Sequence, residues 1–505
     1  MVPNIKKLRW LIVEKGSSEA PDFLSNDLQY IGWRGYPRSR FPDSFQPTNL
    51  AVLKMSKGLQ KKLWKGRKHL PHLKVLELSF MEELVSTPDF DGLPSLQRLV
   101  LTECYKLEKI HPSLGNHKSL KYISVFSYHR SNLKKFPKID HIKKLETLEI
   151  RSFCSDIDFE IPEIQSDMEN LVTLFLCGFR MQVFLSSVAT HCPNIISLRA
   201  SEYYTFYSID YSCFFRLLTH SLRKLDLSGS SLNNFSILDF KLSQLNVLVH
   251  LDLSFCNWLE NLPEFPPSIV VFEANKCDRL TDVGDSIRNC KWLCQVSVRD
   301  GSILNDGDRL LQFMLQGKAI ENHSMVLELQ GLQVPREFQP RLRDGTRCTV
   351  HLPDNWCNDF CGFLMCAVID DFMPHHEGIT MKQVRGGSMG IDSQDGVVWK
   401  ESGDDKRTWV GYVSFGSLRH TTAWLDETCK ALSFSIVDMR RILGRELCRG
   451  FGVTLVPRTI GIGPTDTSPP EYDHEFYKKK YDFKPEFEIK DELTCTFWIP
   501  SVIDI

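Results

Sequence analysis

The chain has 505 residues, of which 42% are apolar and 25% are charged, and its formal net charge is −2. A chain of this length exceeds one compact core, so two or three domains are expected. The near-neutral charge gives no general attraction to nucleic acid or to anionic membranes, and the sequence lacks the roughly 18 consecutive apolar residues of a membrane span.

A short leucine pattern recurs through residues 1–300. Each copy has apolar residues at its first, fourth and sixth positions (+0, +3 and +5), and successive copies start 20 to 27 residues apart, within the range of about 20–29 for leucine-rich repeats. The pattern predicts an α/β leucine-rich-repeat solenoid of about 12–13 units, a horseshoe with parallel strands on its concave face. The copies are LRWLIV, LQYIGW, LAVLKM, LKVLEL, LQRLVL, LKYISV, LETLEI, LVTLFL, IISLRA, LRKLDL, LVHLDL, IVVFEA and LCQVSV.

Each copy predicts a short strand, a turn and a return segment. Residues at +0, +3 and +5 should point into a core that neighbouring units share, with adjacent strands about 4.8 Å apart. Cysteine occupies +8 in three units (Cys104, Cys256 and Cys277), where packing of a small side chain is the preferred interpretation over redox sensing. Prolines in several returns favour irregular arcs over regular helices.

The remaining strand positions should form an open surface, a common binding site in solenoids. Arginine and aromatic side chains, which are enriched at protein interfaces, recur there. They can equally cover neighbouring apolar surface, and both interpretations stay open. The predicted partner-binding residues are Arg98, Tyr122, Phe126, Arg151, Phe175, Arg199, Tyr203, Tyr204 and Lys224.

The period stops near residue 300. Residues 301–324 predict a polar linker with a short helix from Asp308 to Gln316, and residues 325–505 predict an all-β antiparallel sandwich. The strand-like runs of that domain are MVLELQGL, TRCTVHLP, GFLMCAVI, VVWK, TWVGYVSF, ALSFSIV, GFGVTLVP and LTCTFWIP.

Signatures of catalysis and cofactor binding are missing from the sequence. It contains no P-loop, HExxH, GxSxG or GxGxxG motif, and the glycine-rich Gly386–Gly390 lacks the lysine that a phosphate loop needs. The cysteines form no CxxC pair, and His375 and His376 are better explained by a hydrated loop than by a metal site. We therefore expect no catalytic residue, no cofactor and no metal, and the chain is not expected to be an enzyme.

Two sets of motifs in the sequence resemble a known family. The run from Glu77 to Leu120, together with Leu24–Met55, is similar to plant intracellular immune receptors of the TIR–nucleotide-binding–leucine-rich-repeat (TNL) class. LPDNWCNDFCGFLMCAVI, followed by WVGYVSF, LSFSI and RGFGVTLV, resembles the post-repeat domain of that class, the C-terminal jelly-roll and Ig-like domain (C-JID). The similarity extends over nearly the whole chain, but the TIR and nucleotide-binding (NB-ARC) modules are not found in it.

The resemblance implies that the chain recognises a pathogen effector protein through the concave face and the C-JID loops. It also implies the NB-ARC and TIR modules of a full-length receptor as further partners, and a location in the cytoplasm, with the nucleus as a second compartment. The sequence departs from the family at Arg336 and Glu337, which replace a Glu-Trp pair, so binding details are not carried over there. Trp356 does match the family and is interpreted as a core residue.

Other functions remain open. The chain could be a truncated decoy or regulatory leucine-rich-repeat protein without signalling of its own. A ubiquitin-ligase adaptor would need a helical ligase-binding box, and only seven residues precede the first repeat. A secreted ectodomain would need a signal peptide and paired cysteines, which the sequence does not predict.

Overall fold

The computed structural model describes residues 7–15, 21, 23–128, 132–152, 159–178, 182–201, 220–232, 242–299, 301, 307–316, 320, 324–330, 334–336, 338, 343–344, 347–370, 378–384, 406–416, 418, 429–437, 448–458, 487–492 and 494–498. The chain forms two compact units, Met1–Leu248 and Val249–Ile505, which we call unit 1 and unit 2.

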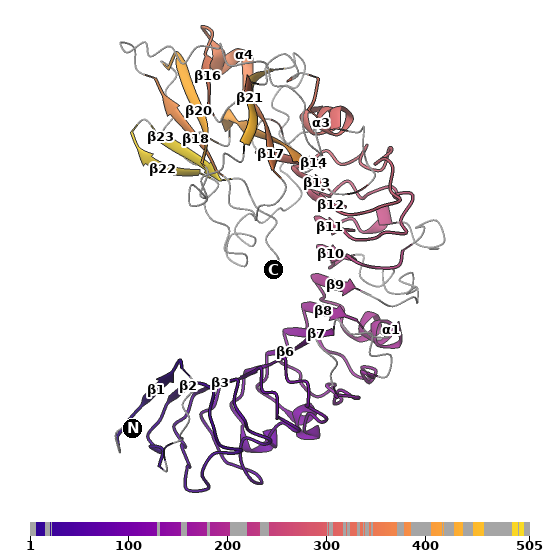
Figure 1. The fold of residues 1–505 in the computed structure, drawn as a ribbon. Helices are drawn as coiled ribbons and strands as arrows, with labels where there is room; N and C mark the ends of the chain where they lie inside the picture. Colours follow the sequence, from indigo (N-terminus) through magenta and orange to yellow (C-terminus); the bar gives the residue numbers. More distant parts are fainter. Residues whose placement is uncertain are drawn as a thin grey trace. The chain divides into compact units, whose positions relative to one another are not determined.

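Unit 1 is a stack of parallel strands in chain order (Figure 1). Every strand pairs with the next one in a register that aligns the leucine pattern, so that Leu76 lies beside Leu99 and Leu99 beside Ile123. This arrangement confirms the leucine-rich-repeat fold. The strands are β1 (Trp10–Val13), β2 (Tyr30–Arg34), β3 (Val52–Ser56), β4 (Val75–Ser79), β5 (Arg98–Thr102), β6 (Tyr122–Ser127), β7 (Thr147–Ser152), β8 (Thr173–Cys177), β9 (Ser197–Ser201) and β10 (Lys224–Asp226).

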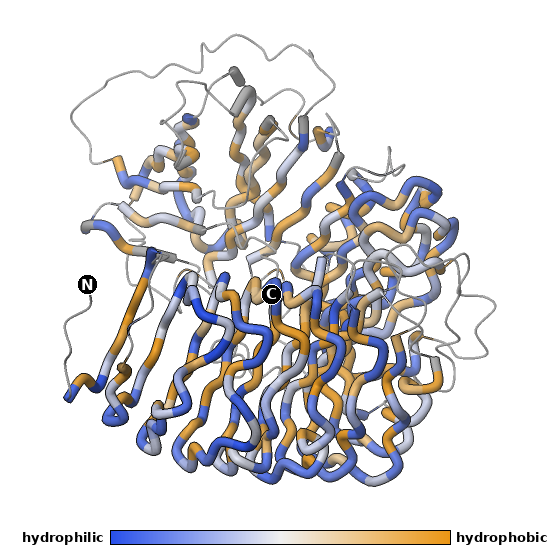
Figure 2. The backbone as a smooth tube through the Cα atoms, turned by 60° about the horizontal axis from the view of Figure 1, so that its bottom comes forward, coloured by the Kyte–Doolittle hydropathy of each residue, from blue (hydrophilic) through white to orange (hydrophobic). Residues whose placement is uncertain are grey.

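The core of unit 1 lies behind its strands. In the repeat that contains β4, the +0, +3 and +5 residues Leu73, Leu76 and Leu78 are fully buried. Complete burial of a leucine is worth about 1.5–3 kcal/mol, and each turn repeats the gain at the same place. Figure 2 shows the result, with hydrophobic stretches at corresponding positions of successive turns.

In several repeats the chain leaves the strand through a left-handed residue at +7, a feature that the sequence did not reveal. Lys57, Phe80 and Glu103 all have φ near +52°. The Phe80 amide donates to the Thr102 carbonyl at 2.7 Å, so this residue adds one more hydrogen bond between neighbouring repeats. At +8 the thiol of Cys104 is buried against the Leu78 carbonyl at 3.6 Å, as the packing interpretation requires.

The return segments of unit 1 that the structure describes are mostly irregular, but some form short 3₁₀ helices and one forms an α-helix. Pro112 opens a short 3₁₀ helix, since its missing N–H and fixed φ suit a first helical position. The return after β8 forms a regular helix that the sequence did not predict, and it buries Leu185 and Val188. These segments are η1 (Phe90–Gly92), η2 (Pro112–Asn116), α1 (Gln182–His191) and η4 (Leu242–Gln244).

Unit 2 begins with three more repeat strands, β11 (His250–Asp252), β12 (Val271–Glu273) and β13 (Gln295–Val298). Strand β14 (Met325–Gln330) pairs in parallel with β13 on one side and antiparallel with β19 (Lys406–Ser414) on the other. The repeat pattern stops before residue 325, but β14 still continues the parallel sheet, and the strand direction changes only between β14 and β19.

The rest of unit 2 is an antiparallel sandwich, as predicted. The Phe363 ring packs against those of Phe415 and Phe434 between the sheets, and the buried Trp356 donates from Nε1 to the Cys429 carbonyl at 3.2 Å. Trp356 is thus a core residue. The further elements are α3 (Gly307–Gln316), β15 (Arg343–Asp344), β16 (Arg347–His351), α4 (Trp356–Asp359), β17 (Phe360–Asp370), β18 (Gly378–Gln383), β20 (Ala431–Val437), β21 (Cys448–Pro457), β22 (Phe487–Asp491) and β23 (Thr494–Trp498).

The predicted strands of this domain agree with the structure in part. The helix expected from Asp308 to Gln316 is α3, and six of the predicted runs after MVLELQGL form strands where they are described. Strands β15, β18 and β22 were not predicted. The predicted run VVWK, at residues 397–400, lies outside the described residues.

Candidate protein-interaction surface

The strands of unit 1 present one face away from the core, formed by the +2, +4 and +6 residues of each repeat. We call it the strand face; α1 lies on the opposite side of the turns (Figure 1). On β5, for example, Leu99 and Leu101 are buried while Arg98, Val100 and Thr102 are half-exposed. Because the strands are in register, equivalent residues form three rows across the sheet. The +2 row, for example, runs from Arg98 through Tyr122 to Lys224.

Arg98 and Tyr122 form the first contact of this surface. The Arg98 guanidinium lies over the Tyr122 ring, 3.7 Å from its centroid. Its Nε lies 3.4 Å from Glu77, which also pairs with Lys54 at 2.8 Å. A carboxylate thus links two cations of neighbouring strands.

A longer stack continues on β6 to β9. The Arg151 guanidinium lies 4.7 Å from the ring centroids of both Phe126 and Phe175, and the Arg199 guanidinium lies 4.5 Å from that of Phe175. Arg199 also pairs with the buried Asp226 at 2.9 Å. Rings and guanidinium groups therefore alternate from strand to strand.

These contacts order the arginine side chains before any partner arrives. Each cation–π contact contributes about 0.5–1 kcal/mol at an exposed site and more where water is excluded. The Arg98, Arg151 and Arg199 side chains remain 42%, 29% and 26% exposed. Ordered but accessible guanidinium groups lose less conformational entropy on binding than free ones.

Burial and neighbouring charge also affect Tyr122. Burial raises the pKa of its phenol, and the charge and hydrogen bond of Glu149 raise it further, whereas Arg98 lowers it slightly. The phenol therefore stays protonated and can donate to Glu149, which is also 3.5 Å from Arg151. Glu149 thus connects the Arg98–Tyr122 pair to the longer stack.

The structure brings most of the predicted residues together. Seven of them lie on the strand face of unit 1, and six of these seven take part in the stacking contacts; Lys224 shares the row of Arg98 and Tyr122. Tyr203 and Tyr204 lie outside the described residues.

Sequence reasoning missed the carboxylates of this surface. Glu77, Glu149 and Asp226 all occupy the +4 row, so the leucine pattern itself could have identified them. The prediction selected only cationic and aromatic residue types. These carboxylates pair with Arg98, Arg151 and Arg199, respectively.

In unit 2 the +4 row carries Asp252 on β11, Glu273 on β12 and Ser297 on β13, and Glu328 on β14 aligns with Ser297. His250 lies 3.0 Å from Glu273, and Arg299 lies 3.0 Å from Glu328. The predicted partner-binding residues that the structure describes all belong to unit 1.

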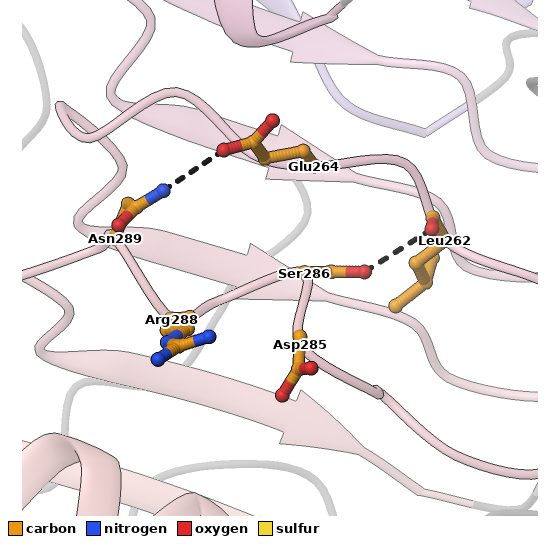
Figure 3. A pocket seen from close by; sticks show the side chains of 6 residues that line it. All are labelled: Leu262, Glu264, Asp285, Ser286, Arg288 and Asn289. Carbon is orange, nitrogen blue, oxygen red and sulfur yellow. Dashed lines mark hydrogen bonds between the residues drawn. The ribbon is translucent and has the colours of Figure 1, made fainter.

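A hollow of about 630 Å³ lies on the return side of unit 2 (Figure 3). Polar side chains that line it already form hydrogen bonds and ion pairs within the protein. Ser286 donates to the Leu262 carbonyl at 3.1 Å, and Asn289 donates to Glu264 at 2.8 Å. Asp285 pairs with Arg309 at 2.6 Å. The wall residues are Leu262, Glu264, Asp285, Ser286, Arg288 and Asn289.

The described parts of the chain show no metal-binding group of three or more His, Cys, Asp or Glu side chains. Within the same parts, no helix is both long and apolar enough to cross a membrane. Residues 371–377, which include His375 and His376, lie outside the described ranges. What the described surface offers is therefore stacked, hydrogen-bonding and ionic contacts.

Comparisons with known proteins give a family-model match and several similar relatives. Residues 329–456 match the family model of the C-JID domain. TMV resistance protein N of Nicotiana glutinosa is 30% identical over 264 residues, which are 52% of this chain and 20% of that protein. Disease resistance protein RPS4B of Arabidopsis thaliana is 27% identical over 289 residues, 52% of this chain and 23% of that protein.

A shorter match of higher identity is to disease resistance protein RPV1 of Vitis rotundifolia, 41% identical over 96 residues, 19% of this chain and 7% of that protein. The chain spans a quarter or less of each of these relatives. A solved LRR protein of Leptospira interrogans aligns with 56% of this chain and 92% of its own at 17% identity and a TM-score of 0.30, so the fold assignment rests on the strand register instead.

Proposed function

We propose, from the combination of leucine-rich repeats and a C-JID domain that this chain shares with the C-terminal part of plant TNL disease resistance proteins, that it is the effector-recognition part of an intracellular immune receptor. Its role would be to bind a pathogen protein, in the cytoplasm and in the nucleus as a second compartment. The strand face of unit 1 would supply the contacts, together with loops of the C-JID domain.

The observation that carries this proposal is the stack of Phe126, Arg151, Phe175 and Arg199. Arginine and aromatic residues dominate the binding energy of protein interfaces. Here the rings order the guanidinium groups, and the Arg151 and Arg199 side chains stay 29% and 26% exposed, whereas Phe175 is buried beneath them. A purely structural role would not require Arg98 to keep 42% of its side chain exposed. The described surface offers no comparable arrangement for catalysis, so recognition is the better-supported function.

The experiment is a binding screen of the full chain against purified secreted proteins of plant pathogens. A true ligand should bind the natural chain and lose affinity for the Arg98→Glu/Arg151→Glu double variant. Arg67→Glu is the matched control, because Arg67 is an exposed arginine that pairs with Asp89 and Asp91 on the return side. A ligand that binds both variants with the same affinity as the natural chain would contradict a strand-face site.

A decoy or regulatory protein would use the same surface. It would bind the same pathogen protein but give no cell-death response in leaves, even when its natural transcript is expressed in full. Expression of that full-length transcript with the identified ligand distinguishes the two roles.

A further inference from the structure

The +2 row of the strand face changes its chemistry along unit 1. On β1 to β4 it consists of Trp10, Tyr30, Val52 and Val75, which are aligned by the parallel register. All four side chains point away from the core, and none is charged. The row then continues without interruption into Arg98 on β5.

The first two residues of this apolar row form a flat aromatic platform. The Trp10 and Tyr30 rings are stacked, with centroids 5.0 Å apart and planes inclined by 12°. The Tyr30 ring lies across Gly32, where a Cβ atom would come within 3.2 Å of it. Trp10 is 63% exposed, and Ile12, its neighbour on the same face, is 62% exposed. Such exposure of a tryptophan and an isoleucine contributes nothing to the core.

The second half of the face, on β5 to β10, is cationic. Its strand-face positions carry Arg98, Arg151, Arg199 and Lys224, against only two carboxylates, Glu149 and Asp226. The guanidinium groups retain exposed donors beyond their internal contacts, and guanidinium groups pair best with carboxylates. The apolar residues of β1 and β2 and the arginines of the second half thus prefer different ligand chemistry, while Lys54 and Glu77 on β3 and β4 pair with each other.

We infer that the strand face of unit 1 takes a segment of its partner protein in which a pair of apolar side chains is followed by acidic residues. The inference rests on the proposed function and names the partner segment. The apolar side chains lie on Trp10, Ile12 and Tyr30, and the carboxylates meet Arg98 and Arg151.

The strand spacing sets the separation of the two parts of the segment. From β1 or β2 to β5 there are three or four strand intervals of about 4.8 Å, a distance of roughly 14–19 Å. An extended segment covers this distance in about four to six residues at about 3.3 Å each. The segment therefore combines an apolar pair with acidic residues at that separation.

The test is to pan a phage-displayed library of random 16-residue peptides against the full chain. Enriched peptides should carry the apolar pair and the acidic residues at the stated separation. A synthetic peptide from this set, followed by fluorescence anisotropy, should bind the Trp10→Ser/Ile12→Ser variant at least about tenfold more weakly, since aromatic anchors contribute most of the binding energy. Val183→Ser is the matched control, because Val183 is 60% exposed on α1.

The outcomes separate this inference from the proposed function. If Arg98→Glu/Arg151→Glu abolishes peptide binding while Trp10→Ser/Ile12→Ser does not, the apolar subsite is wrong and the strand-face site stands. Panning that enriches no peptide, or only peptides without the two parts, overturns the inference and leaves the screen of pathogen proteins to decide the function. A clear fall in thermal stability of Trp10→Ser/Ile12→Ser would show that the chain itself covers the platform, which also overturns the inference.

Discussion

The guanidinium carbon of Arg98 lies 3.7 Å from the centroid of the Tyr122 ring on the neighbouring strand. The two residues belong to adjacent repeats and share the +2 row, so their contact is a direct consequence of the strand register. The same geometry links two repeats and presents a cation to solvent. Stability and recognition are therefore tied to the same side chains.

A double-mutant cycle measures this contact. Arg98→Ala and Tyr122→Leu should each lower the free energy of unfolding, and the double variant should lose less than the sum. We expect a coupling of about 0.5–1 kcal/mol, the range for a cation over a ring at a partly exposed site. Urea denaturation of the four proteins gives the value, and strictly additive losses would contradict the contact.

Arg151 should not tolerate replacement by lysine, although the charge is kept. Its planar guanidinium fits between the rings of Phe126 and Phe175, and an ammonium group cannot stack on both. Arg151→Lys should cost about 1 kcal/mol of unfolding free energy. Arg67→Lys, on the return side and without a ring contact among those described, is the control and should lower the midpoint less, because its ion pairs with Asp89 and Asp91 are exposed. Equal midpoints for the two variants would argue against the stack.

The sequence predicted the features that the leucine pattern controls. Once Leu73, Leu76 and Leu78 point into the core, the alternation of a strand forces Glu77 and its equivalents outward, so the rows of the strand face follow from the repeat alone. The carboxylate or ring that each arginine contacts depends on its side-chain rotamer, which the leucine pattern does not predict. This is why Arg98 was predicted and its contact with Glu77 was not.

Elements outside the leucine pattern were harder to predict. Helix α1 forms in a return segment for which the sequence predicts an irregular arc. Its apolar residues, such as Val188, become buried only when the neighbouring turns provide a surface to pack on. In β18 only Ile379 and Met381 of the six residues are apolar, which is a short and weak strand signal, so its strand character depends on pairing with β20 and β23. Tertiary context overrides local pattern in both cases.

His117 should make the stability of unit 1 depend on pH. Its ring is buried, Nε2 donates to the Leu93 carbonyl at 2.8 Å, and Nδ1 accepts from the Ser119 amide at 3.3 Å. Burial lowers the pKa of His117 below its usual 6.5. The unfolded chain therefore binds more protons below pH 6.5, so stability is complete above that value and is lost as the pH falls from it toward the folded pKa.

Urea midpoints measured between pH 7.5 and pH 5 test this dependence. The natural chain should lose stability across the acidic part of the range, and His117→Gln should give a flatter profile because glutamine does not titrate there. A parallel decline of both proteins would assign the effect to other groups.

The buried cysteines at +8 should resist alkylation in the folded chain. Burial raises the pKa of the Cys104 and Cys277 thiols to about 12, so the reactive thiolate is almost absent at pH 8. Among the cysteines whose burial the structure describes, iodoacetamide at that pH should label the half-buried Cys294, Cys348 and Cys357 before Cys104 and Cys277, as mapped by peptide mass spectrometry. Labelling of Cys104 in native protein at the rate found in urea would contradict its burial.

Gly92 should not accept a larger residue, because its Cα lies against the preceding return. A Cβ there would come within 2.1 Å of the Lys68 carbonyl oxygen, which is backbone and cannot rotate away. Gly92→Ala should cost about 1–3 kcal/mol of unfolding free energy, as overpacking does. Gly66→Asn is the control: nothing lies within 4 Å of its Cβ position, and asparagine tolerates its φ of +66°. Equal losses in the two variants would exclude the clash as the cause.

Strand β14 hydrogen-bonds to a repeat on one edge and to the sandwich on the other. An array of repeats normally frays from its open ends, yet the edge of β13 is closed by a strand whose removal would also dismantle the sandwich. Amide protons of β11 to β13 should therefore exchange together with those of β17 and β19, as one cooperative block. Duplication or loss of whole repeats can be accommodated upstream of this block, whereas an insertion between β13 and β14 would break the joint that holds it together.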